Sequence, residues 1–328
     1  MTAYETAKLA YDAKTKPRGS LGRLEELGCR LAAIRGFVPR ALDAVIVVAA
    51  ADHGVAREGV SAYPQEVTAQ MVANFAAGGA AVNVLARQAG ARLIVVDAGI
   101  AVAFEHELVR PVRLGGGTAN LAEGPAMTAE QARRGLEAGA ALADELRDVD
   151  VVALGDMGIG NTTSASALTA ALLGVDATLV CGRGTGLDDA GVARKVETVR
   201  RALDVNRRSD PLTALGGFEI VFLAGLALGC AANGTAVLLD GFITSAAALA
   251  ATRIDPAVRD VLIASHRSPE PGHALVLEAL GLEPLLDLEL RLGEGSGAAL
   301  ALPLLRSSIA ILEEMATFDD AGVTDSGR

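Results

Sequence analysis

Aromatic side chains are scarce in this chain: tryptophan is absent, and aromatic residues make up only 3% of the 328 residues. Proteins that bind single-stranded nucleic acid stack the bases on aromatic side chains. The net charge of −11 also lacks the positive field that attracts a phosphate backbone. The sequence therefore argues against a nucleic-acid partner. A small anionic substrate is compatible with this charge, because loops and helix N-termini bind phosphate without net positive charge.

Cysteine and histidine are also scarce, and their spacing excludes several kinds of site. The three cysteines (Cys29, Cys181 and Cys230) form no Cys-x-x-Cys pair, and the four histidines show no His-Glu-x-x-His spacing. This usage is typical of a reducing compartment and predicts neither a disulfide framework nor a zinc site. The first residues contain no basic segment followed by an apolar one, as a secretion signal would. We therefore expect a cytoplasmic protein without a metal or a cofactor.

Long uncharged apolar runs are missing too, although 51% of the residues are hydrophobic. The longest candidate for a membrane span, residues 218–251, contains Glu219, Asn233 and Asp240. A membrane-spanning helix needs about 20 nearly uncharged residues. We expect instead a buried helix, a turn and a buried strand, and no membrane span. The composition suits a protein whose sheet is covered on both faces.

Short apolar runs that end in small polar residues recur along the chain. These runs are residues 44–51, 92–96, 149–154, 177–180, 235–239 and 261–264. Alanine-rich helical segments separate most of them, for instance residues 128–147, where Thr128 and Gln131 have the spacing of a capping box. This alternation predicts an α/β fold with a mostly parallel sheet and helices on both faces. In such sheets ligands bind beyond the carboxyl ends of the strands.

The two ends of the chain are predicted to be helical. Leucines in residues 21–34 recur at helical spacing, and residues 298–316 are apolar apart from Pro303. We expect residues 1–40 and 298–328 to form a small helical subdomain. Residues 41–297 would then form the large α/β domain that carries the active site.

Two glycine-rich loops are candidates for binding phosphate. Residues 155–163 follow an apolar run and open a helix, with glycines at positions 158 and 160. They match neither the dinucleotide fingerprint nor the P-loop, and a capped turn between strand and helix explains them equally well. Residues 181–186 form the second loop. Lys195, which follows this second loop, could reach an anion bound at the first loop, although a solvated helix face is the simpler interpretation of Lys195.

Glu294 is the most distinctive candidate, because it stands alone between glycines in residues 292–297. Glycine loses more conformational entropy on folding than other residues and has no side chain to pack, so a glycine-flanked glutamate is an unfavourable way to build a core. It is well suited to bringing a small ligand close to the backbone and presenting one titratable group to it. A carboxylate at this position could also cap the following helix, whose dipole favours negative charge. The two roles are compatible.

Taken together, these segments resemble the nicotinate-nucleotide–dimethylbenzimidazole phosphoribosyltransferase family, in the family's order across nearly the whole chain. The matching segments are residues 16–24, 51–55, 59–61, 117–120, 155–163, 182–186, 240–242, 265–266 and 291–297. The resemblance implies a Rossmann-like sheet and a homodimer. It also implies the transfer of ribose 5-phosphate, with inversion, from nicotinate mononucleotide to 5,6-dimethylbenzimidazole. The products would be nicotinate and α-ribazole 5′-phosphate, the lower-ligand precursor of cobalamin.

The resemblance assigns roles to individual residues. Glu294 would be the general base that takes a proton from the benzimidazole. The residues implied for the ribose phosphate are Asp156, Met157, Gly158, Gly184, Lys195 and Ser268, and those implied for the base pocket are Gln70, Tyr63 and Leu292. Two positions depart from the family pattern. The family often has glutamate at position 156, where the shorter aspartate leaves room for a water, and Pro269 replaces the small residue expected after Ser268.

Two alternatives stay open at the level of sequence. The same chemistry could use another acceptor, such as adenine, another benzimidazole or a phenolic, and the pocket around Gln70 and Tyr63 would decide between them. The second alternative is a non-catalytic nucleotide sensor on the same fold. The intact loop around Glu294 argues against a sensor, because a sensor need not retain a base.

Overall fold

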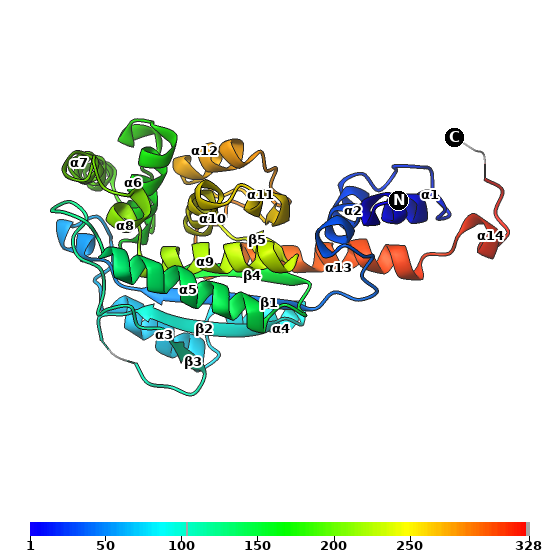
Figure 1. Ribbon diagram of the computed structural model, residues 1–328, viewed down its shortest axis with the longest axis horizontal. Helices are drawn as coiled ribbons and strands as arrows, with labels where there is room; N and C mark the ends of the chain where they lie inside the picture. The colour runs from blue at the N-terminus through cyan, green and yellow to red at the C-terminus, as the bar shows by residue number, and fades with distance from the viewer. Residues whose placement is uncertain (103, 326–328) are drawn as a thin grey trace.

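A six-stranded sheet forms the centre of the computed structural model, which describes residues 1–102 and 104–325 (Figure 1). The strands are β1 (Ala44–Ala51), β2 (Arg92–Gly99), β3 (Val109–Pro111), β4 (Val151–Met157), β5 (Ala236–Leu239) and β6 (Leu262–Ala264). Their order is β3-β2-β1-β4-β5-β6, and neighbouring strands of this sheet are parallel. The strand order reverses between β1 and β4, which is where doubly wound sheets bind ligands. The expected Rossmann-like α/β fold is confirmed.

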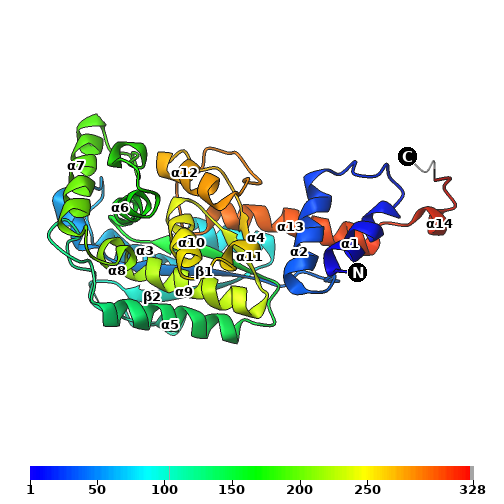
Figure 2. The same ribbon diagram turned by 45° about the horizontal axis from the view of Figure 1, so that its top comes forward.

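Helices cover both faces of the sheet (Figures 1 and 2). One face carries α5 (Ala129–Glu145), α6 (Asn161–Leu173), α7 (Asp189–Val205), α8 (Pro211–Leu215), α9 (Phe218–Asn233), α10 (Phe242–Ile254), α11 (Val258–Val261) and α12 (Pro271–Leu280). The other carries α3 (Val67–Ala76), α4 (Ala81–Ala89) and α13 (Ser296–Glu314), and α1 (Ala3–Asp12) and α2 (Arg23–Arg35) extend the core on this side beyond the end of the sheet. The short helix α14 (Phe318–Ala321) follows α13, and η1 (Gly54–Glu58) and η2 (Ala177–Leu179) are 3₁₀ turns.

Strand β1 shows why the sheet is apolar on both sides. All of its residues are buried. Val45 and Val47 belong to the core on one face, and Ile46 and Val48 belong to the core on the other. Because successive side chains of a strand point to opposite faces, a strand buried on both faces is a continuous apolar run.

The sequence predicted most of these elements correctly. The predicted helix at residues 128–147 is α5, and its capping box between Thr128 and Gln131 is formed. The expected buried helix, turn and strand in residues 218–251 are α9 and β5, followed by α10. The strand predicted at residues 177–180 is wrong. The Asp176 side chain accepts the Thr178 N–H at 2.9 Å, which favours the 3₁₀ turn η2 over an extended chain.

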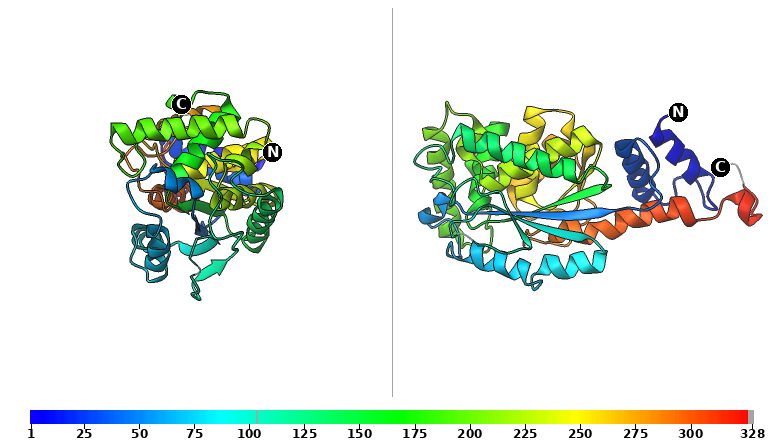
Figure 3. Two further views of the ribbon diagram at one scale, coloured as in Figure 1. Left: turned by 90° about the vertical axis from the view of Figure 1, so that its left-hand side faces the viewer. Right: turned by 60° about the horizontal axis from the view of Figure 1, so that its bottom comes forward.

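Helix α13 links the sheet to the helices of the N-terminus (Figure 3). It contacts β1 and β4 at one end and α1 and α2 further along. The Tyr11 hydroxyl donates to the Ser308 carbonyl at 2.6 Å, and the Lys14 ammonium donates to the Met315 carbonyl at 2.7 Å. The two ends of the chain therefore lie side by side, away from the sheet (Figure 1).

Two apolar segments of the described residues, 67–89 and 296–314, are long enough to cross a membrane by length and composition alone. In the more apolar window of α13, 56% of the residues are buried inside the protein. Leu302, Leu305 and Ile309 all belong to the core on that face of the sheet. Packing inside the protein therefore explains the apolar character of α13.

Candidate active site

Polar side chains gather at the carboxyl ends of neighbouring strands, on both sides of the point where the strand order reverses. Asp52 follows β1, Asp156 lies near the end of β4, Asp240 follows β5, and Ser265 follows β6. All four are buried. Because parallel strands end at the same edge of a sheet, one site collects side chains that are far apart in the sequence.

Asp156 presents a buried carboxyl group with a free acceptor atom. Its Oδ2 accepts a hydrogen bond from the Asn161 side-chain amide at 2.9 Å, while its Oδ1 has no partner among the described residues. Burial raises the pKa of Asp156 well above its usual value, and the nearby carboxylates of Asp240 and Glu219 raise it further. The carboxyl group therefore keeps its proton to a higher pH and can hydrogen-bond a sugar hydroxyl.

Glu294 is held in a strained conformation directly against β4. Its φ angle is 65°, in the left-handed region that non-glycine residues rarely adopt. The Glu294 N–H donates to the Asp156 carbonyl at 3.1 Å. A Cβ added at Gly155 would lie 2.5 Å from the Glu294 carbonyl oxygen, so this approach requires glycine there. Strain that surrounding contacts maintain in this way is typical of functional sites.

The side chain of Glu294 is buried near the N-terminus of α4. Its Oε2 has no hydrogen-bond partner in the described part of the chain. Burial raises the pKa of Glu294, the backbone N–H of Val82 lowers it, and the carboxylate of Asp240 raises it again. The net effect is a raised pKa, which gives the carboxylate a stronger affinity for a proton than an exposed glutamate has.

Asp240 fixes the loop that carries Glu294. Its carboxylate accepts the backbone N–H groups of Gly295 at 3.1 Å, Gly297 at 2.7 Å and Ala298 at 3.1 Å. The sequence offered Glu294 as a possible cap of α13, and this interpretation is wrong because Asp240 occupies that position. In the sequence, Asp240 stands out only as an aspartate at the end of an apolar run. This pattern does not predict which backbone N–H groups its carboxylate accepts.

Lys195 of α7 connects the two glycine-rich loops. Its side chain is fully buried, and its ammonium donates to Thr162 Oγ1 at 2.9 Å and to the Gly182 carbonyl at 3.4 Å. The solvated helix face that the sequence suggested is therefore wrong for this residue. Burial lowers the pKa of Lys195, and the carboxylate of Glu270 raises it. A buried ammonium beside glycine-rich backbone is a suitable arrangement for binding phosphate.

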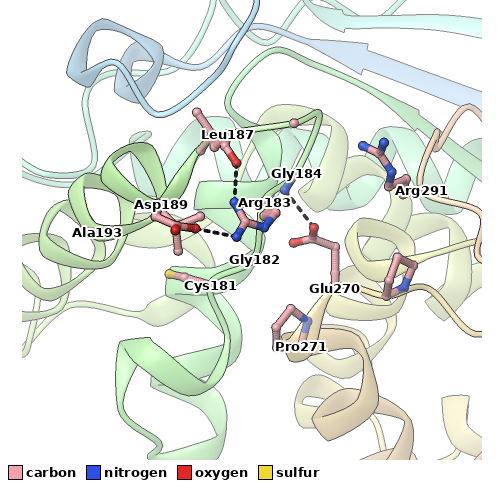
Figure 4. A pocket seen from close by; sticks show the side chains of 13 residues that line it. Cys181, Gly182, Arg183, Gly184, Leu187, Asp189, Ala193, Glu270, Pro271 and Arg291 are labelled. Carbon is pink, nitrogen blue, oxygen red and sulfur yellow. Dashed lines mark hydrogen bonds and ion pairs between the residues drawn. The ribbon is translucent and has the colours of Figure 1, made fainter.

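Two cavities lie beside the second glycine-rich loop and share part of their lining, and Figure 4 shows the larger of them. The larger has a volume of about 920 Å³ and the smaller about 60 Å³. Gly184, Glu270 and Arg291 line both of them. The guanidinium of Arg291 has no hydrogen-bond or ion-pair partner among the described residues, so it is available to an anionic ligand.

The loop around Ser268 borders the smaller cavity, and a histidine of the following helix hydrogen-bonds its backbone. The Ser268 N–H donates to His273 Nδ1 at 3.0 Å, and Nε2 of the same ring lies 3.1 Å from Ser245 Oγ. Burial lowers the pKa of His273 to about 3, and electrostatic interaction with His266 and Arg267 contributes to the same effect. His273 is therefore neutral, with Nδ1 as acceptor and Nε2–H as donor to Ser245. Sequence reasoning missed this positioning residue.

The structure brings only part of the predicted site together. Asp156, Gly184, Ser268 and Leu292 line the smaller cavity, and Lys195 lies 3.7 Å from the position of a Cβ added at Gly184. Met157 and Gly158 lead from β4 towards α6, with Gly158 packed against His53. Tyr63 and Gln70 are exposed and contribute to the described lining of neither cavity. Leu292 is 56% exposed.

Comparison with known proteins adds independent findings. The sequence model of a family described as phosphoribosyltransferase matches residues 1–323. A protein of Azotobacter vinelandii is 54% identical over 96% of this chain and 92% of its own length, and one of Roseiflexus sp. is 52% identical over 98% and 94%. Both are named nicotinate-nucleotide–dimethylbenzimidazole phosphoribosyltransferase.

The fold of a solved relative is also closely similar. The crystal structure of CobT from Thermus thermophilus superposes with a TM-score of 0.94 at 49% sequence identity, and the match covers 99% of each chain. The glycine-rich loops, the terminal helices and the Glu294 loop therefore all lie within the matched region.

Proposed function

The chain belongs to this phosphoribosyltransferase family, and on that premise we propose how its site carries the phosphoribosyl group from nicotinate nucleotide to dimethylbenzimidazole. The chain is an enzyme, a phosphoribosyltransferase, as its relatives are named. One observation carries the mechanism: Glu294 is a buried carboxylate with an unpartnered oxygen, a raised pKa and a backbone locked against β4.

The reaction is a substitution at the anomeric carbon of the ribose. One nitrogen of the benzimidazole forms a bond to this carbon, and the bond to the positively charged pyridinium nitrogen breaks, which releases nicotinate. Attack from the opposite face of the sugar inverts the configuration from β to α. The other benzimidazole nitrogen carries a hydrogen, which becomes acidic as positive charge develops on the ring.

Glu294 is the group that we assign to this proton. A carboxylate within hydrogen-bond reach of the N–H accepts the proton as the carbon–nitrogen bond forms, so the product leaves without a positive charge. General-base assistance of this kind contributes about 10²–10⁴-fold to the rate. Orientation of two substrates in one site supplies a further large part of the acceleration.

Of the residues proposed for the nucleotide, Asp156, Gly184 and Ser268 line the smaller cavity. Asp156 offers its carboxyl group to the ribose, and Lys195, Gly184 and Ser268 surround the position of the phosphate, with Met157 and Gly158 in the adjoining loop. The buried ammonium of Lys195 and the N–H groups of the glycine-rich loop are the donors that a phosphate dianion requires. Tyr63, Gln70 and Leu292 are proposed for the benzimidazole, on the side of the sheet where α3 and α4 pack.

The assignment is tested by incubating the protein with nicotinate mononucleotide and dimethylbenzimidazole and detecting the ribotide by mass. The Glu294→Gln variant should keep its fold and its nucleotide affinity but lose turnover by about 10²-fold or more. Glu289→Gln is a matched control, because Glu289 also has a left-handed backbone (φ 55°) but is exposed. Turnover of Glu294→Gln close to that of Glu289→Gln would remove Glu294 from the mechanism.

The acceptor is tested separately from the chemistry. Adenine, another benzimidazole or a phenolic, offered together with dimethylbenzimidazole in one assay, would compete for the same donor, and product masses give the preference directly. Binding of nicotinate mononucleotide without release of nicotinate in the presence of every acceptor would instead support the nucleotide sensor.

We also propose that the protein works as a cytoplasmic homodimer, in which the residues described within 1–40 and 298–328 form a helical subdomain beside the α/β domain predicted for residues 41–297; residues 103 and 326–328 of these ranges lie outside the described residues. The free thiols of Cys29, Cys181 and Cys230 support a reducing compartment. The homodimer is what the resemblance to the family implies. Light scattering at several protein concentrations tests the oligomeric state.

A further inference from the structure

Glu270 places a carboxylate inside the proposed phosphate site. It precedes α12, and its side chain points towards the loop that contains Gly184 (Figure 4). Its Oε1 accepts the Gly184 N–H at 2.8 Å, and its Oε2 is buried and has no hydrogen-bond partner among the described residues. The same side chain lines both cavities. A carboxylate is an unexpected neighbour for a substrate group that is itself negatively charged.

The loop is shaped closely around this carboxylate. A Cβ added at Gly182 would lie 2.5 Å from Glu270 Oε2 and 2.7 Å from Pro271 Cδ, so this close approach favours glycine. The Gly182 carbonyl also accepts a hydrogen bond from the Lys195 ammonium. The backbone that would surround a phosphate therefore already surrounds an anionic group.

The charge of Glu270 also acts on Lys195. Burial lowers the pKa of this ammonium, and Glu270 opposes that effect. A buried ammonium without a nearby anion is strongly unfavourable, because it has lost its hydration and gained no counter-charge. Glu270 thus offsets part of the cost of burying the Lys195 ammonium while no substrate is present.

We propose that Glu270 is the resident counter-ion of the phosphate site. In the free enzyme its carboxylate accepts the Gly184 N–H and balances the positive charge of Lys195. The phosphate of the nucleotide replaces the carboxylate in both roles. This inference rests on the proposed function, which places the phosphate at Gly184 and Lys195. Glu270 is a positioning residue, since it keeps the loop and the ammonium in place before the nucleotide arrives. It also competes with the phosphate, so it weakens nucleotide binding.

If Glu270 competes with the phosphate, removing its charge should strengthen phosphate binding, whereas general damage to the site would weaken it. In the Glu270→Gln variant, the amide oxygen still accepts the Gly184 N–H, but the negative charge is gone. Nicotinate mononucleotide and inorganic phosphate should then bind more tightly, by roughly tenfold, as expected when one of two neighbouring like charges is removed. Nicotinate riboside, which has no phosphate, should bind with unchanged affinity.

Calorimetric titration of the three ligands makes the measurement, with Glu278→Gln as the matched control. Glu278 lies on α12 and is exposed, so this variant changes the net charge equally without touching the site. Its affinities should equal those of the wild type. Weaker binding of the nucleotide to Glu270→Gln, or an equal change for the nucleotide and the riboside, would overturn the proposal.

Two further measurements cover the cases in which Glu270→Gln does not fold or the proposed function is wrong. If Glu270→Gln does not fold, Glu270→Asp replaces it, because the shorter carboxylate no longer reaches the Gly184 N–H and inorganic phosphate should again bind more tightly. If Glu270→Asp binds phosphate no better than the wild type, the proposal is wrong. Failure of the wild type to form the ribotide would refute the proposed function instead, and phosphate titration would still decide the role of Glu270.

Discussion

The carboxylate of Asp240 accepts the backbone N–H of Gly297 at 2.7 Å, at the start of the helix that follows Glu294. Two more N–H groups, those of Gly295 and Ala298, bond to the same carboxylate. The end of β5 therefore holds the segment that carries the proposed base, although Gly295 and Asp240 are 55 positions apart in the sequence.

Asp240→Ala should strongly destabilise the protein, because it leaves three buried N–H groups without their acceptor. Each buried donor left without a partner costs about 1–3 kcal/mol, so the loss of the acceptor for three of them should cost about 3 kcal/mol or more. The free energy of unfolding in urea measures the effect. Asp287→Ala is the control, because Asp287 makes an exposed ion pair and should change stability by less than about 1 kcal/mol. Equal effects of the two substitutions would show that Asp240 does not hold the loop.

Asp156→Asn should make the protein more stable at neutral pH while impairing nucleotide binding. The folded-state pKa of Asp156 is raised above its unfolded value, chiefly by burial. The native state therefore holds the proton more tightly, and this stability is fully present below the unfolded pKa and is lost as the pH rises through the folded pKa. Asparagine has no such proton to lose and can still accept the hydrogen bond from Asn161.

The measurement for Asp156→Asn is the urea midpoint as a function of pH. Wild type and variant should be similar in acid, and the variant should become the more stable of the two as the pH increases. Asp148→Asn, at an exposed position, controls for the change in net charge. A variant that is less stable than the wild type at neutral pH would show that Asp156 is ionised and favourably paired in the native state.

The sequence predicted the strands and the edge at which the site lies, because both follow from local patterns. A strand such as β1 is a continuous apolar run, and Asp52, Asp156 and Asp240 each mark the end of one. The short edge strand β3 was missed, because three residues that end in Pro111 are too few to show the alternation of apolar and polar residues that indicates a strand. The turn η2 was predicted as a strand, since the pattern of Ala177–Leu179 is apolar and the cap from Asp176 is a local detail.

The burial of Lys195 and Glu270 could not be predicted in the same way. On α7, Lys195 stands in a segment rich in charged residues, and only the packing of α6 and the loop at Gly182 shows that it points inward. The Gly184 N–H meets Glu270 across 86 positions of sequence. Contacts of this kind depend on how elements are placed in three dimensions, and no local period or spacing records them.

Lys195→Met should weaken binding of nicotinate mononucleotide without affecting the acceptor base. Methionine has a similar length and fills the buried space, but it removes the ammonium that faces Thr162 and Gly182. A charge-assisted hydrogen bond contributes about 1.5–3 kcal/mol, so the KM for the nucleotide should rise by roughly tenfold or more. Steady-state kinetics with each substrate varied in turn measures this, and Arg194→Met, next to it on an exposed position, should leave both KM values unchanged. An equal increase in both KM values would indicate general damage.

Arg291→Ala should raise the KM for nicotinate mononucleotide and leave kcat nearly unchanged. The guanidinium lines both cavities, next to Gly184 and Glu270, and has no described partner that it would have to give up. Because Arg291 is exposed, its attraction for phosphate is partly screened, and we expect an increase in KM of roughly three- to tenfold that shrinks at high salt. Arg267→Ala is the control, since Arg267 is exposed and pairs with Asp287. Steady-state kinetics at low and high ionic strength separates the two variants. A KM that does not change, or a fall in kcat with an unchanged KM, would show that Arg291 does not bind the phosphate of the substrate.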